Sequence, residues 1–189
     1  MLPTLPSRSG HFCLESGYHT DLWITLDALF TDSRRFAEPV KDLAERLRPY
    51  DVDAVCGPFV GGAFLALLLA ETLNARFFYT QLAAATSDGM FGARYSLTAE
   101  LARQIEGCRV AVVDDVVSAG SSVRATIDAV RAAHASVVVV GCLTLLGTKG
   151  KAYFDDIGIR VEHMDARPLT MWHPADCPLC AARVALETT

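Results

Sequence analysis

The stretch Val110–Ser122, VAVVDDVVSAGSS, decides the fold of this chain. Its first part, Val110–Val113, is a short apolar run rich in β-branched residues, which is typical of a buried strand. Asp114 and Asp115 follow directly, and open α/β sheets bind ligands at the carboxyl ends of their strands. Two adjacent carboxylates repel each other, so a buried core would not retain them without a partner. Because carboxylates only accept hydrogen bonds, the pair suits a ligand with two neighbouring hydroxyl groups.

A turn of small residues comes next, and the apolar spacing of a helix begins after it. The turn consists of Ser118, Ala119, Gly120, Ser121 and Ser122. The first N–H groups of a helix lack intrahelical partners, and the helix dipole favours an anion there. An ordinary turn with Ser122 as N-cap would explain the serines but not the aspartates. We therefore expect this region to bind a ligand with a diol and a phosphate.

The segment VVDDVVSAGSS resembles the phosphoribosyl diphosphate (PRPP) signature of type I phosphoribosyltransferases. The resemblance implies that Asp114 and Asp115 hold the ribose 2′- and 3′-hydroxyls and that Ser118–Ser122 hold the 5′-phosphate. It also implies an α/β fold, with a parallel sheet flanked by helices and a flexible hood. Mg²⁺ would arrive with PRPP, held mainly by ligand oxygens and water rather than by the protein alone.

A glycine-rich loop at 57–62 forms the second candidate anion site. Glycines let the backbone approach an anion closely, and a helical pattern begins directly after the loop. The alternative is a tight turn that permits close packing of helix on sheet. Beside the first motif, the loop resembles the family's pyrophosphate loop, which implies diphosphate binding by Gly57, Pro58, Phe59, Val60, Gly61 and Gly62.

The rest of the chain alternates strand-like and helix-like segments, which predicts a parallel sheet covered on both faces. We expect strands at Leu22–Asp27, Val52–Cys56, Arg76–Thr80, Arg109–Val113, Val137–Leu146 and Ile159–His163. We expect helices at Arg35–Arg48, Ala63–Leu73, Ser122–Ala133 and Lys151–Asp156, with Asn74 as a left-handed cap. Residues 1–189 are interpreted as one domain, with a hood segment at 10–27, a mobile loop at 83–97 and a tail at 168–189.

The hood segment resembles the orotate phosphoribosyltransferase branch of the family at Phe12, Leu14, Ser16 and Gly17. In that branch the segment covers the base, and the best single expectation is transfer to orotate, giving orotidine 5′-phosphate. Tyr18 and His19 are candidates for contacting the base, although they would equally serve to cap the sheet. Lys149, after the strand at 137–146, is a candidate for the orotate carboxylate.

The cations common in that branch are absent or replaced at Glu15, Gly61, Arg94 and Lys149. Arg94 is the only cation within 83–97, and we expect it to clamp the diphosphate because a guanidinium binds phosphate in a bidentate manner. These departures leave two alternatives open. The chain acts on another base, or it is a catalytically inactive regulator that binds PRPP or a nucleotide.

Composition limits the remaining function classes. A net charge of −5 disfavours nucleic-acid binding, and no apolar run reaches membrane-spanning length. No signal peptide is visible, so a cytoplasmic location is expected. The family resemblance suggests a homodimer.

Two of the six cysteines, Cys177 and Cys180, form a C-x₂-C pair, with His173 four residues upstream. One interpretation is a partial zinc site at His173, Cys177 and Cys180, completed by another ligand. The other is a reduced pair packed in the tail, which the lack of a second pair favours.

Overall fold

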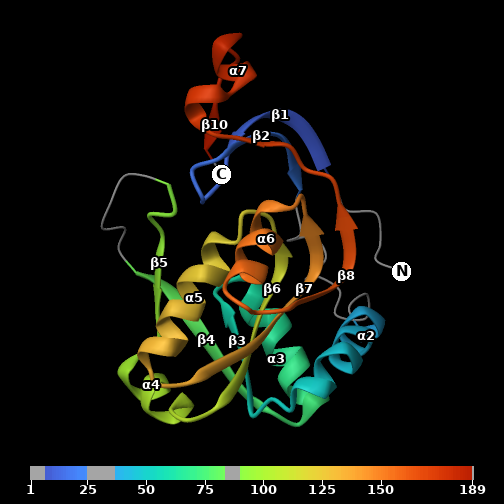
Figure 1. Ribbon diagram of the computed structural model, residues 1–189, viewed down its shortest axis with the longest axis vertical. Coiled ribbons are helices and arrows are strands. Elements are labelled where there is room, and N and C mark those ends of the chain that lie inside the picture. Colours follow the sequence, from blue (N-terminus) through green and yellow to red (C-terminus); the bar gives the residue numbers. More distant parts are fainter. Residues whose placement is uncertain (1–6, 25–36, 84–89, 189) are drawn as a thin grey trace.

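The computed structural model describes residues 7–24, 37–83 and 90–188, and a six-stranded sheet lies at its centre (Figure 1). The strand order is β5-β4-β3-β6-β7-β8, and every neighbouring pair is parallel except β4 and β5. The strands are β3 (Ala54–Pro58), β4 (Arg76–Ala83), β5 (Arg94–Ser96), β6 (Arg109–Val117), β7 (Ser136–Leu146) and β8 (Val161–Arg167). The predicted α/β fold with a mainly parallel sheet is confirmed.

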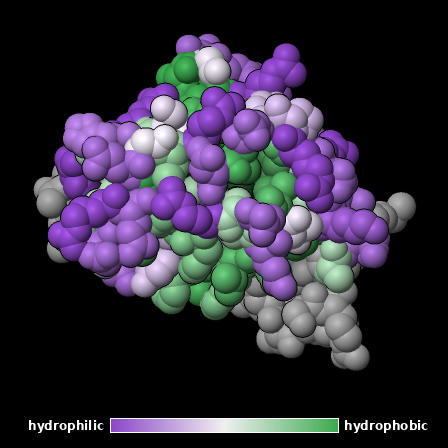
Figure 2. All heavy atoms as spheres, turned by 90° about the horizontal axis from the view of Figure 1, so that it is seen from below, coloured by the Kyte–Doolittle hydropathy of each residue, from purple (hydrophilic) through white to green (hydrophobic). Residues whose placement is uncertain are grey.

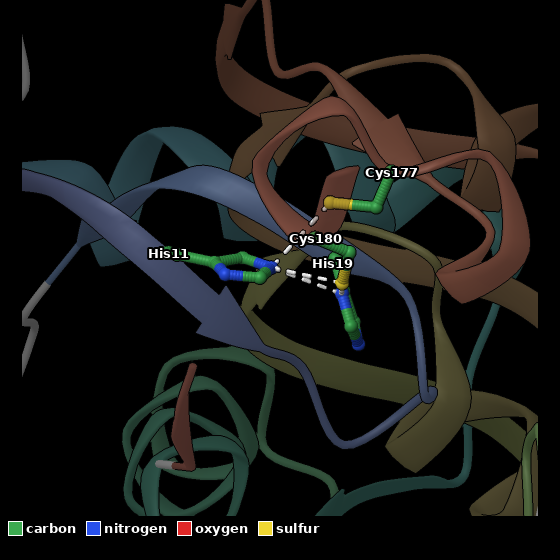
Figure 3. Close-up of side chains that lie close together, drawn as sticks. All are labelled: His11, His19, Cys177 and Cys180. Carbon is green, nitrogen blue, oxygen red and sulfur yellow. Dashed lines mark hydrogen bonds between the residues drawn. The ribbon is translucent and has the colours of Figure 1, made fainter. Parts of the chain in front are cut away.

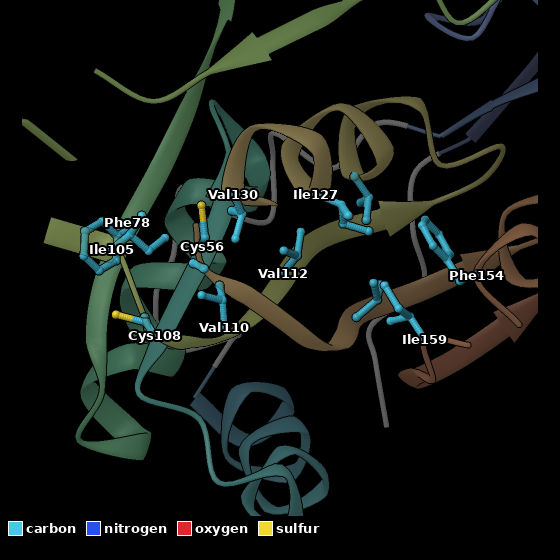
Figure 4. Packing of buried hydrophobic residues seen from close by; sticks show 14 of the residues in the cluster. Cys56, Phe78, Ile105, Cys108, Val110, Val112, Ile127, Val130, Phe154 and Ile159 are labelled. Atoms are coloured by element: carbon cyan, nitrogen blue, oxygen red, sulfur yellow. The ribbon is translucent and has the colours of Figure 1, made fainter. Parts of the chain in front are cut away.

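Helices cover both faces of this sheet. One face carries α2 (Ala37–Leu47) and α3 (Gly61–Leu73), and the other carries α4 (Ala99–Ile105), α5 (Ser121–Ala132) and α6 (Lys149–Asp156). Alternate residues of β6 enter the two cores: Val110 and Val112 pack with Ile127 of α5, while Ala111 and Val113 pack on the α2–α3 side. Figure 4 shows the first of these cores. The burial of both faces explains why β6 begins as a continuous apolar run.

The end of β6 differs from the prediction. The strand continues beyond Val113 to Val117, so that Asp114 pairs with Cys142 of β7 inside the sheet. Helix α5 begins at Ser121 with Gly120 as its N-cap, and Ser122 is not the cap. Gly120 has a φ of 78°, and a Cβ there would lie 3.0 Å from the Phe154 ring. Glycine satisfies both the backbone conformation and the close packing.

A smaller four-stranded sheet lies over one end of the main sheet, with α7 (Pro178–Ala181) beside it (Figure 1). Its order is β10-β1-β2-β9, so the C-terminal strands β9 (Met171–Trp172) and β10 (Glu187–Thr188) flank an N-terminal hairpin. That hairpin consists of β1 (Ser7–Cys13) and β2 (His19–Ile24). The strand expected at 22–27 therefore begins earlier, and its residues 25–27 lie outside the described part of the chain.

The predicted mobile loop at 83–97 is only partly described. Residues 94–96 form β5, which pairs with the end of β4, and residues 84–89 lie outside the described chain. Asn74 has φ 53° and ψ 41°, which confirms the predicted left-handed cap of α3.

On the face seen in Figure 2, hydrophilic side chains dominate on the two sides, and hydrophobic side chains gather in a band between them. In the part of the chain that the structure describes, no helix is both long and apolar enough to cross a membrane.

Candidate functional site

A cavity of about 400 Å³ lies between the main sheet and the small sheet. The turn after β1 contributes Leu14 and Glu15, and the end of β6 contributes Asp114 and Asp115. The small-residue turn adds Ser118, Ser121 and Ser122. The turn after β1, the acid pair and the serine turn therefore converge on one cavity. The last two meet there because the carboxyl ends of neighbouring parallel strands lie at one edge of the sheet.

The acid pair forms the floor of this site. Asp114 is 7% exposed; its Oδ2 accepts a hydrogen bond from Ser122 Oγ at 2.7 Å, and its Oδ1 accepts one from the Asp115 amide at 3.0 Å. Asp115 Oδ1 accepts a hydrogen bond from the Val116 amide at 2.8 Å. Burial, and then the neighbouring charge of Asp115, raise the pKa of Asp114 well above its usual value. A cation or a hydroxyl donor in the cavity would favour the ionised form.

Asp114→Asn is therefore expected to raise the melting temperature at neutral pH. A carboxyl whose pKa is higher in the folded state loses stability as pH rises from the unfolded value of about 3.9 through the folded value. Asparagine removes that loss, and each 1 kcal/mol gained corresponds to about 2–4 °C in a domain of this size. Melting curves from pH 4 to pH 8 should show a gap between the variant and the parent protein that widens with pH. The exposed Asp21→Asn is the control, and an equally wide gap for both variants would contradict the assignment.

The serine turn already holds a carboxylate in this structure. Glu15 accepts hydrogen bonds from Ser121 Oγ at 2.9 Å and from Tyr95 Oη at 2.8 Å. Burial, and then the charge of Glu15, raise the pKa of Tyr95. Glu15 thus joins the small sheet to β5 and to the start of α5. It also places negative charge where the sequence predicts an anion-binding turn.

The glycine loop packs directly against the acid pair. Four of its residues, Pro58, Phe59, Val60 and Gly61, line the cavity, and the Phe59–Val60 peptide bond is cis. A Cβ on Gly61 would collide with the Asp115 carboxylate, and one on Gly62 would lie 2.7 Å from Asp114 Oδ1. The glycine loop therefore requires glycine where it meets the acid pair at the end of β6.

The residues expected to contact the base occupy other positions. Lys149 Nζ lies 4.7 Å from the Tyr18 ring centroid, but neither residue lines the cavity. His19 is buried with its ring directed toward His11, and it does not line the cavity either. The small sheet instead presents Leu22, Trp23 and Ile24 to the cavity. Alternation of apolar and polar residues in the sequence 22–27 was the available signal, but it did not indicate which face would meet a ligand.

Basic residues are absent from the described lining of this cavity, which contains three carboxylates. Arg94, on β5, lines a neighbouring hollow together with Tyr95 and Asp128. Its predicted contact with a diphosphate is not tested by this position.

The tail cysteines do not gather around His173. The Nδ1 of His173 accepts a hydrogen bond from the Ala175 amide at 3.3 Å and thereby caps the short 3-10 helix η3 (Pro174–Asp176). Cys177 and Cys180 lie instead beside His11 and His19. This group differs from the predicted set of three in its histidines, which come from the distant N-terminal hairpin.

The chain is similar in sequence to proteins of known family. The family model described as a phosphoribosyl transferase domain matches residues 29–165. A protein of Thermotoga maritima named orotate phosphoribosyltransferase is 34% identical over 179 residues, which are 94% of this chain and 88% of that protein.

Two solved structures share the fold. The orotate phosphoribosyltransferase of Aeropyrum pernix aligns with a TM-score of 0.64 at 22% identity, over 85% of this chain and 87% of that one. The adenine phosphoribosyltransferase of Thermoanaerobacter pseudethanolicus aligns with a TM-score of 0.66 at 19% identity, over 77% and 88%. Because enzymes named for different bases align equally well, the fold does not discriminate the base.

Proposed function

Since this chain belongs to the phosphoribosyltransferase family, we propose that it transfers the phosphoribosyl group of PRPP to a ring nitrogen of orotate. A bond forms between that nitrogen and C1 of the ribose, while the bond from C1 to the diphosphate oxygen breaks and its electron pair leaves with diphosphate. The nitrogen loses its proton to solvent or to the departing diphosphate. The convergence of the acid pair, the serine turn and the glycine loop on one cavity carries the proposal of phosphoribosyl transfer. The name of the Thermotoga maritima relative supports orotate as the base.

Each segment has a role in this proposal. Asp114 and Asp115 accept hydrogen bonds from the ribose hydroxyls, and their charge stabilises the positive charge that develops on the ribose. The residues 118–122 hold the 5′-phosphate through N–H and hydroxyl groups, and the loop 57–62 holds the diphosphate. Catalysis then rests on positioning and on stabilising the departing charge.

Magnesium fits the oxygen donors at this site. Asp114 and Asp115 supply carboxylates, and the cavity wall adds the hydroxyls of Ser118 and Ser122. When bound with PRPP, Mg²⁺ would neutralise part of the diphosphate charge. It would thereby supply positive charge that no described residue of the cavity lining provides.

Glu15→Gln is expected to tighten PRPP binding about threefold to tenfold. Glutamine keeps a hydrogen-bond acceptor for Ser121 but removes a negative charge beside the proposed phosphate turn. Like charges at close range repel even at a partly exposed site. Calorimetric titration with PRPP and Mg²⁺ would measure the change. Weaker binding would instead make Glu15 a favourable part of the site.

We also propose that the chain forms a homodimer through an apolar patch on α3 and the loop before it. Phe59, Val60, Phe64 and Leu67 are 50%, 52%, 44% and 50% exposed. The Phe59 and Phe64 ring centroids lie 6.5 Å apart, and Leu67 is three residues after Phe64 on the same face of α3. Such a group of large apolar side chains is typical of an interaction surface. A partner subunit would cover this patch next to the cavity.

Leu67→Asp is expected to shift the protein from dimer to monomer, because it buries a charge in the proposed interface. Light scattering during gel filtration would measure the mass. The control is Leu82→Asp on β4, whose parent side chain is 60% exposed and lies outside the patch. A monomeric parent protein would overturn the proposal.

Diphosphate release with PRPP, Mg²⁺ and a panel of bases tests the proposed reaction. Release with orotate alone is the expected result. The lack of a basic residue among the described lining residues favours one second candidate, transfer to a base without a carboxylate. Release with a purine but not with orotate would support that candidate. Binding of PRPP without release for any base would indicate a regulator and exclude both reactions.

A further inference from the structure

Four potential metal ligands converge outside the cavity, where the N-terminal hairpin meets the tail (Figure 3). His11 lies on β1 and His19 on β2, while Cys177 and Cys180 lie at the start of α7. One nitrogen of each histidine and the sulfur of each cysteine all lie within 4.8 Å of one another. The segments that supply them are more than 150 residues apart in sequence, so folding alone brings the ligands together.

Four of the six distances between these atoms match the edges of a tetrahedron around one zinc ion, and the other two, from Cys177 Sγ to His19 Nδ1 and to Cys180 Sγ, are within 4.8 Å. His11 Nε2 lies 3.0 Å from His19 Nδ1, 3.4 Å from Cys177 Sγ and 3.7 Å from Cys180 Sγ, and Cys180 Sγ lies 3.3 Å from His19 Nδ1. Zinc bonds of about 2.0–2.1 Å to nitrogen and about 2.3 Å to sulfur give edges of about 3.4 Å for N–N and about 3.6 Å for N–S. The observed values agree to within about 0.4 Å without any movement of the backbone.

The orientation of His11 also suits a ligand. Its Nδ1 lies 2.9 Å from the carbonyl oxygen of Val184, so a proton on Nδ1 is donated to that oxygen. This tautomer leaves the Nε2 lone pair directed at the other three atoms. A backbone carbonyl that fixes the second nitrogen of a histidine is the usual support of a metal ligand. The tail thus contributes an orienting group in addition to two sulfurs.

We propose that His11, His19, Cys177 and Cys180 bind one structural Zn²⁺ ion. Two thiolates and two imidazoles are a closed tetrahedral set for zinc and leave no position for substrate. Two thiolates balance the charge of the ion, which suits a site where His11, His19 and Cys177 are only 1%, 5% and 3% exposed.

The proposed ion would join the two ends of the chain above the cavity. The turn between His11 and His19 carries Leu14, Glu15 and Ser16, all of which line the cavity. The tail between Met171 and Thr188 otherwise adds only the two-residue strands β9 and β10 to the small sheet. Zinc would therefore fix the position of the turn and, with it, the contact of Glu15 with Ser121. This inference does not depend on the proposed reaction.

Elemental analysis of the purified full-length protein tests the proposal. Protein produced with zinc and purified under reducing conditions without chelators should contain one zinc per chain. After removal of the zinc, added Co²⁺ should produce the visible absorption of tetrahedral cobalt and a thiolate-to-cobalt charge-transfer band. Cys177→Ser and Cys180→Ser should each lose stoichiometric zinc, and the melting temperature of the parent protein should fall when zinc is removed.

Two control variants, at a histidine and a cysteine outside the proposed ligand set, test whether the loss of zinc is specific to the four ligands. His173→Asn retains a capping side chain for η3 and should keep the zinc, which distinguishes the four-ligand set from one that includes His173. Cys13→Ser alters a cysteine of β1 that is outside the proposed ligand set, and this variant should also keep the zinc.

Zinc well below one equivalent in the parent protein, together with no tetrahedral cobalt spectrum, would overturn the proposal even if the variants failed to fold. Thiols should be titrated in unfolded protein with a chelator present, so that zinc protects none of them. Two fewer free thiols than the six cysteines in the parent protein, but not in Cys177→Ser, would indicate a disulfide at Cys177 and would equally overturn the proposal.

Discussion

Replacing both Asp114 and Asp115 by asparagine is expected to weaken PRPP binding by a factor of about 10² to 10⁴. Each carboxylate can accept a hydrogen bond from a ribose hydroxyl, and a bond to a charged group contributes about 1.5–3 kcal/mol. Loss of two such bonds amounts to about 3–6 kcal/mol, and every 1.4 kcal/mol changes affinity tenfold. Isothermal titration calorimetry in the presence of Mg²⁺ would measure the loss directly.

Folding must be shown to survive this double substitution. The asparagine introduced at position 114 can still accept from the amide of residue 115 and donate to the hydroxyl of Ser122, so the turn keeps its contacts. We expect unchanged circular dichroism and a melting temperature no lower than that of the parent protein. Asp21→Asn, at an exposed position of β2, should bind PRPP normally. Parent-like affinity in the double variant would exclude the acid pair from the site.

The sequence predicted the main sheet well because local patterns and burial agree there. Apolar β-branched runs identified its central strands, and 3.6-residue spacing identified α2 and α5. The end of β6 was misjudged because Asp114 and Asp115 look like the start of a loop. Pairing of Asp114 with Cys142 and of Val116 with Thr144 keeps them in the strand. The neighbouring strand β7 thus outweighed the low strand propensity of aspartate.

The small sheet could not be predicted from local patterns. Its strands β9 and β10 have two residues each, too few to show a period, and they pair with strands more than 150 positions away. His19 appeared as a candidate for contacting the base, His11 was not assigned a role, and the cysteines appeared as an incomplete set. Counting potential ligands over the whole chain, rather than within one segment, would have suggested that the two pairs belong together.

The candidate site likewise has one part that sequence patterns predict and another that they do not. Its acid pair, serine turn and glycine loop are continuous in sequence and lie at strand ends, so their convergence could be predicted. The contacts of Glu15 and the stacking of Lys149 on Tyr18 depend on how the hairpin rests on the sheet. No local pattern encodes that orientation, which is why the base-facing residues were assigned less well.

Gly61→Ala is expected to lower the free energy of unfolding by about 1–3 kcal/mol, the usual cost of forcing extra atoms into a packed site. The added Cβ would lie 2.8 Å from Asp115 Cγ and 3.1 Å from its Oδ1. Asp115 cannot simply rotate away, because its Oδ1 accepts the hydrogen bond from the Val116 amide. PRPP affinity should fall at least tenfold, since the shift displaces a proposed ribose ligand. Denaturant unfolding and calorimetry would measure the two effects.

A double-mutant cycle with Asp115→Ala shows whether the contact between Gly61 and the Asp115 carboxylate causes this loss of stability. Gly61 is the first residue of α3, and alanine is preferred over glycine in helices by up to about 1 kcal/mol. Once the Asp115 carboxylate is gone, Gly61→Ala should therefore be neutral or stabilising. The destabilisation by Gly61→Ala should therefore disappear or change sign in the Asp115→Ala background, which no independent pair of sites would show. An equal loss in both backgrounds would mean that the glycine loop does not pack on the acid pair, and the proposed shared site for ribose and diphosphate would lose its structural basis.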